Sequence, residues 1–317
     1  MPTQIVGHSR QIEYLNRVLA RGRLAHAYLF HGPSHLGKST IAEGLAKTFY
    51  CKNLPKSIRE ACNACPECLR IEKNIHPQVV KLSPEFALTP AKEKREGISI
   101  QDIRELKRKF SLAPSGALWR VAIMDQAETM SLDAANSFLK LLEEPGRQTL
   151  FILISALPDI LLPTIVSRTQ QISFSQVADK DLLQMLASFS AAPHKMKKLL
   201  ELAHGRPGLL QRMLSDSSYA DEESGLREKI QEIISKADIA ELFLLNERAA
   251  LNEEMRERII YNILGTGRAR LAQSQTRSDR TKWIVRLKQA HRIYSLLETT
   301  NVNHRLALDS AFLEFLA

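Results

Sequence analysis

The chain has 317 residues, a length that predicts two or three domains because one hydrophobic core rarely serves so many residues. Its composition, 44% hydrophobic and 25% charged, is typical of a soluble globular protein, and no apolar run approaches the ~20 residues that cross a membrane. The N-terminus lacks the apolar segment of a secretion signal, so we expect a cytoplasmic protein; the net charge of +9 is compatible with DNA as a partner or with an ordinary basic surface.

Short apolar runs in the first half of the chain predict strands of a parallel sheet covered on both faces. They are residues 27–30, 78–82, 119–125 and 149–155. Helical patterns alternate with them, and they cover residues 39–49, 99–110 and 131–146. The last of these helices has Ser131 as its cap and is stopped by Pro145 and Gly146. This alternation predicts an α/β domain over residues 1–174.

Beyond residue 175 the strand signal stops and helical patterns follow. Gly205 is a predicted helix end and Pro207 a predicted helix start. The polar segment 215–225 is interpreted as a domain boundary, and the polar segment 272–282 as a break between helices. We therefore predict a small helical domain over residues 175–215 and a larger one over residues 216–317.

A phosphate-binding loop occupies the turn between the first strand and the next helix. The stretch "GPSHLGKST" fits G-x-x-x-x-G-K-[ST] through Gly32, Gly37, Lys38 and Ser39, with Thr40 next in the same helix. The loop amides and the helix N-terminus would hold the phosphates of ATP or ADP, Lys38 would reach the β- and γ-phosphates, and Ser39 would ligate Mg²⁺. A vestigial loop that keeps this shape without binding a nucleotide is the alternative.

The carboxylates that accompany such a loop are incomplete. Asp125 ends the third strand and is the candidate for holding Mg²⁺, but Gln126 follows where many ATPases place a glutamate. An amide cannot take a proton from the attacking water, and Glu128 lies two residues too far along. Ser155, at the end of the fourth strand, is a weak candidate for sensing the γ-phosphate. We therefore expect nucleotide binding more than turnover.

All four cysteines lie within eighteen residues, at positions 51, 62, 65 and 68. Such clustering in a cytosolic chain favours a metal over disulfides. Cys51, Cys62, Cys65 and Cys68 suit a closed tetrahedral Zn²⁺ site, which is structural because no coordination position remains open. An iron–sulfur cluster is the alternative, and His76 is a possible spare ligand. The resulting zinc knuckle would be an insertion at 51–68 in the α/β domain.

The ordered motifs resemble those of the delta-prime subunits of the bacterial DNA polymerase III clamp loader. The motifs are "LAHAYLFHGPSHLGKST", the cysteine insertion, "HPQVVKLSPE", "ISIQDIRELKRKFSLAP", "LLEEP" and "LLPTIVSRTQ", within residues 5–174. The resemblance implies an AAA+ module, a three-helix lid and a helical collar for oligomerisation. It also implies a hetero-pentamer with delta and three motor subunits of the gamma/tau type, which places the sliding clamp on primed DNA.

The resemblance further implies the role of a stator, a subunit that does not hydrolyse ATP itself but supplies an arginine to the nucleotide bound by its neighbour. Arg168, in "SRT", stands at the position of that arginine, with Thr169 in place of the usual cysteine. Gly208 stands where motor subunits have a second sensor arginine, and Arg206 is displaced from it. The phosphate loop leaves open a second hypothesis, an ATP-hydrolysing motor-type subunit. A zinc-dependent DNA-binding protein with an inert loop is a third.

Overall fold

The computed structural model describes residues 5–54, 61–86, 88, 97–111, 119–187, 193–250, 252–299 and 303–316. Within the predicted zinc insertion, residues 55–60 lie outside these ranges. The chain divides into two compact units, Met1–Asp181 and Leu182–Ala317. Among the helices described, none combines the length and the apolar character that a membrane span requires.

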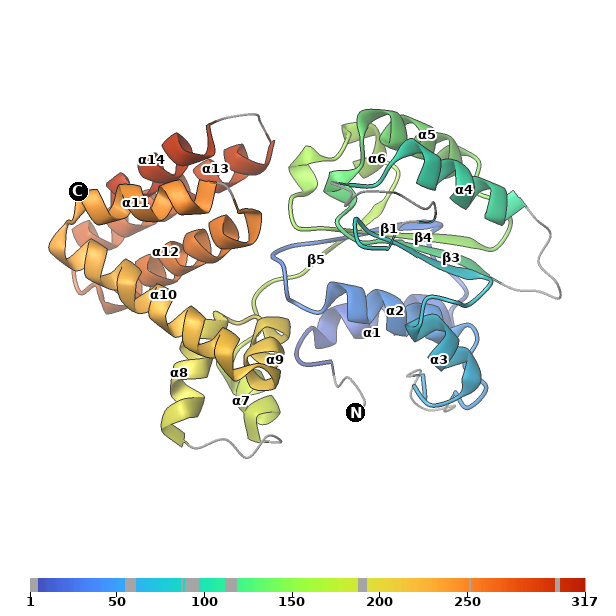
Figure 1. Ribbon diagram of the computed structural model, residues 1–317. Helices are drawn as coiled ribbons and strands as arrows, with labels where there is room; N and C mark the ends of the chain where they lie inside the picture. Colours follow the sequence, from blue (N-terminus) through green and yellow to red (C-terminus); the bar gives the residue numbers. More distant parts are fainter. Residues whose placement is uncertain are drawn as a thin grey trace. The chain divides into compact units, whose positions relative to one another are not determined.

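Five parallel strands form the sheet of the first unit in the spatial order β2-β3-β4-β1-β5 (Figure 1). Their bounds are β1 Ala27–His31, β2 Val79–Leu82, β3 Arg120–Met124, β4 Thr149–Ser155 and β5 Gln170–Ser173. His31 pairs with Ser155, and Met124 pairs with Leu153, so the carboxyl ends of the three central strands meet at one edge. Ligands of open α/β sheets bind at this edge.

Helices cover both faces of the sheet (Figure 1). One face carries α1 Ser9–Ala20, α2 Lys38–Thr48 and α3 Pro66–Glu72; the other carries α4 Ile100–Ser111, α5 Leu132–Glu143 and α6 Pro163–Val166. Successive side chains of a strand point to opposite faces, so Tyr28 and Phe30 join the core under the first set, whereas Leu29 joins the core under the second. The predicted α/β sheet domain is confirmed.

The apolar runs gave the four predicted strands to within one residue at most ends, because each run is buried on both faces. Ser131 caps α5 as predicted, its Oγ accepting a hydrogen bond from the N–H of Ala134 at 3.1 Å. The first helix, α1, was not predicted, although Ile12, Leu15 and Leu19 lie on one face and pack into the core. The short α3 in the cysteine insertion was not predicted either.

The second unit is helical throughout its described residues. The boundary between the units falls within α7 Asp179–Ala187, and the later helices are α8 Pro193–Ala203, α9 Pro207–Ser215, α10 Ser217–Lys236, α11 Ile239–Ala250, α12 Glu253–Gln273, α13 Arg277–Thr299 and α14 His304–Leu316. Gly205 has φ 73°, and Pro207 begins α9, as predicted. The division of this helical part into domains at residue 215 stays a prediction.

The polar segment 215–225, interpreted from the sequence as a domain boundary, is helical from Ser217 onward. Asp216 caps α10 by accepting from the N–H groups of Ser218 and Tyr219, and the helix continues through the whole polar segment. The polar side chains are helical because they find partners on α12: the buried Glu223 accepts a hydrogen bond from Arg258, and Asn262 lies 3.5 Å from the same carboxylate. The predicted break over residues 272–282 is confirmed, but it is confined to residues 274–276.

Candidate nucleotide and metal sites

The phosphate loop connects β1 to α2, and its two glycines have backbone conformations that other residues rarely adopt. Gly32 has φ 137°, and a Cβ built on it would lie 2.1 Å from the carbonyl oxygen of Phe174. Gly37 has φ 85° and is the N-cap of α2. The motif therefore has its predicted context, a buried strand followed by a helix whose first N–H groups are open to an anion.

Lys38 begins α2, and its ammonium lies over the loop. Its Nζ donates to the carbonyl oxygens of Gly32 and Pro33, the latter at 2.7 Å, and the residue is only 6% exposed. The charge is thus held inside the curl of the loop, where a phosphate would compete with these carbonyls for it. Ser39 and Thr40, the next residues of the helix, are half-buried.

His8 supports the loop from α1, a contact not apparent from the sequence. Its Nε2 lies 3.0 Å from the carbonyl oxygen of Leu36, and its ring packs edge-on against Phe174 at 5.0 Å. Burial lowers the pKa of His8, and the nearby charge of Lys38 lowers it further. At neutral pH the ring is therefore neutral and can donate to Leu36.

Asp125 follows β3 directly and reaches the carboxyl edge of the sheet, as predicted. Its Oδ1 accepts a hydrogen bond from the N–H of Gln126 at 3.0 Å. Gln126 is exposed and left-handed, with φ 53°. Asp125 is available for a magnesium ion, and the next side chain is an amide in a strained turn.

Glu128 takes a position that the sequence did not reveal. It lies in the short 3-10 helix Ala127–Thr129, and its Oε1 accepts from the N–H of Ala156 at 2.9 Å, after β4. Its Oε2 is buried and has no hydrogen-bond partner among the described residues. Ser155 is fully buried beside it, with its Oγ accepting from the N–H of Leu157 at 3.0 Å. One of the two carboxylate oxygens is thus bound to the turn after β4.

Arg168 lies between α6 and β5 with an exposed guanidinium. Its Nη1 donates to the carbonyl oxygen of Thr164 at 3.1 Å, and its Nη2 donates to Oε1 of Glu143 at 3.0 Å. The two side chains are 39% and 52% exposed. Exposed pairs of this kind contribute about 0–1 kcal/mol, so Glu143 orients the arginine without trapping it.

Arg206 is engaged within the second unit. It is 5% exposed, its guanidinium lies 3.9 Å from the centre of the Tyr261 ring, and its Nε lies 3.4 Å from the carbonyl oxygen of Ala203. A stacked, buried arginine of this kind has a structural role in its own unit. This observation argues against Arg206 as a replacement for a second sensor.

The four cysteine sulfurs converge as the spacing predicts. The Sγ atoms of Cys51, Cys62, Cys65 and Cys68 all lie within 4.8 Å of one another. Zn–S bonds of about 2.3 Å in a tetrahedron separate the sulfurs by about 3.8 Å, so the cluster can hold such an ion. The N–H of Cys62 donates to Cys51 Sγ, and the N–H of Cys65 to Cys62 Sγ, both at 3.3 Å. Backbone donors of this kind stabilise thiolates.

Backbone hydrogen bonds also affect the acidity of the cluster. The N–H of Cys68 is the main cause that lowers the pKa of Cys65, to about 6, whereas burial raises the pKa of Cys68. His76 is not part of the cluster: its ring packs on Tyr50 at 4.3 Å, and its Nδ1 accepts from the N–H of Gln78. The idea of a spare ligand is thus not supported.

Lys47 connects the cysteine insertion to α2. Its Nζ donates to Oδ1 of Asn63 at 3.0 Å and forms ion pairs with Glu43 at 2.9 Å and Glu72 at 3.6 Å. The lysine is 5% exposed, so these partners compensate a nearly buried charge. The cysteine cluster is therefore attached to the helix that begins at the phosphate loop.

Residues 7–178 match the protein family described as DNA polymerase III, delta subunit. This match covers more than half of the chain. The chain belongs to that family.

Two curated relatives are delta-prime subunits of DNA polymerase III, so the predicted resemblance is confirmed. The one from Bacillus subtilis (strain 168) is 33% identical over 197 residues, 62% of this chain and 56% of the relative. The one from Pseudomonas aeruginosa is 31% identical over 228 residues, 70% of this chain and 66% of the relative.

Other subunits of the same polymerase are also similar to this member of the family. The tau subunit of Bacillus subtilis is 30% identical over 179 residues, 56% of this chain and 30% of the relative. The chain thus spans less than two thirds of the length of each of these three relatives. A solved gamma subunit-related protein of Thermotoga maritima covers 96% of this chain and 98% of its own, with 19% identity and a TM-score of 0.43.

Proposed function

We propose that this chain is the delta-prime stator of a bacterial DNA polymerase III clamp loader and acts in the cytoplasm. In this role it assembles with a delta subunit and three gamma/tau-type motor subunits and helps to place the sliding clamp on primed DNA. Membership of the family and similarity to both delta-prime and tau subunits support the assignment. The AAA+ module, the lid and the collar at 1–174, 175–215 and 216–317 are the corresponding domains.

In this proposal Arg168 assists the hydrolysis of ATP that is bound by a neighbouring subunit. A guanidinium supplied across a subunit boundary stabilises the charge that develops on the γ-phosphate of the neighbour's ATP. The observation that carries the proposal is the exposure of Arg168 at 39%, with Glu143 and Thr164 as its partners within the chain. A side chain already oriented at the surface by two hydrogen bonds loses little freedom on docking, and its weak ion pair can exchange Glu143 for a phosphate.

The chain's own nucleotide pocket would bind and not hydrolyse. Gly32, Gly37, Lys38, Ser39 and Thr40 would hold the phosphates of ATP or ADP, and Asp125 with Ser39 would hold Mg²⁺. Ser155 is the weaker candidate at the γ-phosphate. The exposed amide of Gln126 cannot act as a general base, and Glu128 holds the N–H of Ala156 through Oε1, so we expect binding more than hydrolysis at this pocket.

Zinc would be structural in this protein. Cys51, Cys62, Cys65 and Cys68 supply four thiolates, which leave no coordination position for water or substrate. When bound, the ion crosslinks the end of α2 to the start of α3. The backbone N–H groups of Cys62 and Cys65, which donate to cysteine sulfurs, would stabilise the thiolates.

Reconstitution of the complete clamp loader tests the role of Arg168. In complexes containing the Arg168→Ala chain, clamp-dependent ATPase should fall by about 10³-fold at the site that this subunit faces, as for other arginine fingers. Arg147→Ala removes another exposed arginine of the same unit and should leave turnover unchanged. Normal assembly with unchanged ATPase in the Arg168→Ala complex would contradict the assignment.

An ATP-hydrolysing motor-type subunit is the second candidate, and the complete phosphate loop favours it. Under this alternative the purified chain alone hydrolyses Mg-ATP near the enzyme median of ~10 s⁻¹, and Lys38→Ala abolishes turnover. Under the stator proposal the chain alone shows no turnover, and Lys38→Ala removes only nucleotide binding. The same two proteins, assayed for binding and for hydrolysis, therefore separate the two candidates.

A further inference from the structure

The positive charge of the chain is concentrated in one segment of the second unit. Between residues 268 and 292 there are eight basic residues and one acidic residue, so this segment carries a net +7 of the chain's +9. On α13 the basic residues are Arg277, Arg280, Lys282, Arg286, Lys288 and Arg292. The last turns of α12 add Arg268 and Arg270. We call residues 268–292 the basic strip.

The charges of the basic strip are exposed and uncompensated. Seven of the eight basic residues are exposed, and Arg286 is half-buried. Among the described side chains, no carboxylate lies within 4.0 Å of any of the eight. Its one acid, Asp279, accepts from the hydroxyl of Thr276 at 2.7 Å in the cap of α13. By contrast, Lys229 and Lys236 on α10 pair with Glu241 and Glu232.

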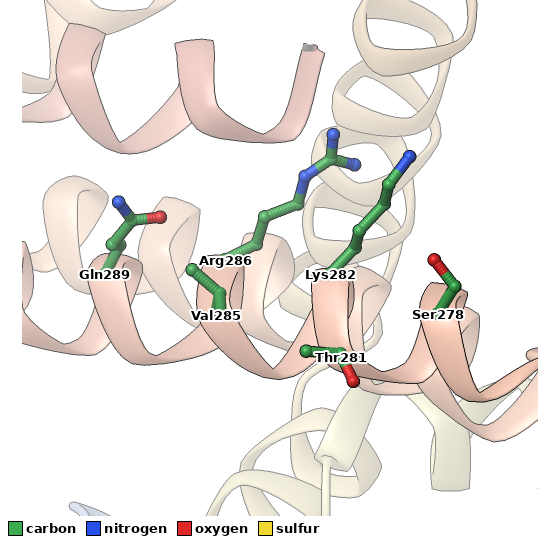
Figure 2. Close-up of a pocket in the computed structure, with 6 residues that line it drawn as sticks. All are labelled: Ser278, Thr281, Lys282, Val285, Arg286 and Gln289. Atoms are coloured by element: carbon green, nitrogen blue, oxygen red, sulfur yellow. The ribbon is translucent and has the colours of Figure 1, made fainter.

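A shallow open groove runs along this part of α13. It has a volume of about 560 Å³ and is lined by Ser278, Thr281, Lys282, Val285, Arg286 and Gln289. Figure 2 shows Lys282 and Arg286 extending in the same direction from neighbouring turns of the helix. Like charges four residues apart destabilise a helix slightly, so the proximity of the two charges does not itself stabilise α13. Hydroxyl and amide side chains beside Lys and Arg are the donors that contact phosphates.

We propose that the basic strip binds the sugar–phosphate backbone of DNA independently of sequence. From Arg277 to Arg292 the charges extend along about 22 Å of helix, which fits a polymer of phosphates and not a single anion. A protein partner would require an apolar centre, but among the described residues the strip exposes only two large aliphatic side chains, Ile284 and Val285, and only Val285 lines the groove. Interfaces with DNA are polar and strongly positive.

Stacking on bases is not part of this site. Trp283 is the single aromatic residue of the strip apart from His291, and its ring packs against Phe315 with centroids 5.8 Å apart. The guanidinium of Arg286 lies 4.9 Å from the same ring. With its ring already covered, Trp283 cannot serve as a platform for a base, and binding therefore depends on charge and hydrogen bonds to the backbone.

Binding of labelled DNA by the full chain tests the proposal. Fluorescence anisotropy is measured with one mixed-sequence oligonucleotide, single-stranded or annealed to its complement, over a series of salt concentrations. In the Lys282→Gln/Arg286→Gln variant, two phosphate contacts are lost. At about 0.1 M salt the affinity should fall by about 25-fold for the single strand and about 60-fold for the duplex, and the salt dependence should become shallower. The loss should be larger for the duplex because each phosphate contact to duplex DNA releases more counterion.

Lys229→Gln/Lys236→Gln is the matched control, since it removes two lysines of the same unit that are already paired with glutamates. Circular dichroism verifies that both variants are folded. DNA affinity equal to wild type in the Lys282→Gln/Arg286→Gln variant, or an equal loss in the control, would overturn the proposal. So would competition by poly-glutamate as effective as by unlabelled DNA. Because the chain is used alone, failure here leaves the role of Arg168 in the assembled complex untouched.

Discussion

Gly32→Ala should strongly destabilise the first unit, because the phosphate loop approaches β5 more closely than any Cβ allows. The added methyl would lie 2.1 Å from the carbonyl oxygen of Phe174, whereas real Cβ atoms stay beyond 3.0 Å, so the two segments must separate by about 1 Å. That separation disturbs the hydrogen bond from the N–H of Phe174 to the carbonyl of His31, which is 2.8 Å long. Backbone strain of about 1–3 kcal/mol and overpacking of about 1–3 kcal/mol give a loss of about 4 kcal/mol.

Gly44→Ala is the matched control in the helix that follows the loop. Gly44 lies inside α2, and a Cβ there meets nothing within 4 Å. Alanine is the better helix former by about 1 kcal/mol, so this variant should be slightly more stable than the wild type. The same substitution at two positions twelve residues apart is therefore expected to lower stability at Gly32 and to raise it at Gly44.

Tryptophan fluorescence during urea unfolding measures both effects in one unit. Trp119 stacks on Phe49 at the end of α2, with ring centroids 5.0 Å apart, and Trp283 belongs to the second unit. In a Trp283→Phe background the emission reports on the first unit alone. In thermal unfolding, the expected loss of stability in Gly32→Ala corresponds to a decrease of about 8–16 °C in Tm for a unit of this size. A Gly32→Ala variant within about 0.5 kcal/mol of wild type would refute the steric argument.

Further predictions concern the metal cluster and one buried histidine. Cys65→Ser should abolish stoichiometric zinc, measured by elemental analysis, and should lower the thermal stability of the first unit to that of chelator-treated wild type; retention of zinc at wild-type stoichiometry would argue against a four-thiolate site. Burial, together with the charges of Arg206, Arg227 and Arg268, lowers the pKa of His204 to about 3. Below pH ~6.5 the unfolded histidine therefore takes up a proton that the folded one does not, and stability should fall by about 1.4 kcal/mol per pH unit down to about pH 3. His204→Asn, which tolerates the left-handed φ of 49°, should remove this slope in urea titrations of the second unit.

Local patterns in the sequence were sufficient for four of the five strands, the loop and the convergence of the four cysteines. The four predicted strands are largely apolar because both of their faces are covered, whereas β5 buries only Ile172. The phosphate loop is a contiguous motif with fixed glycines. The cysteines converge because three of them are separated by only two residues each. These features depend on neighbours in the chain, so one sequence is enough to predict them.

Contacts between distant residues were not predictable. The hydrogen bond from Ala156 to Glu128 joins residues 28 apart, and the pair of Arg168 and Glu143 joins residues 25 apart. The helical state of the polar start of α10 was not predicted for the same reason, since the buried Glu223 is paired with Arg258, 35 residues later. A side chain's environment in such cases is set by the tertiary fold, which composition and periodicity do not contain.

The helix α2 connects the cysteine insertion to the phosphate loop. It begins at Gly37, spans about 16 Å and ends where the N–H of Cys51 donates to the carbonyl of Lys47 at 2.9 Å. With zinc bound by the four cysteines, this helix would be held at both ends and would transmit tilt from the cysteine insertion to the phosphate loop. A partner subunit that contacted the cysteine insertion would therefore act on the phosphate loop from the far end of a single helix.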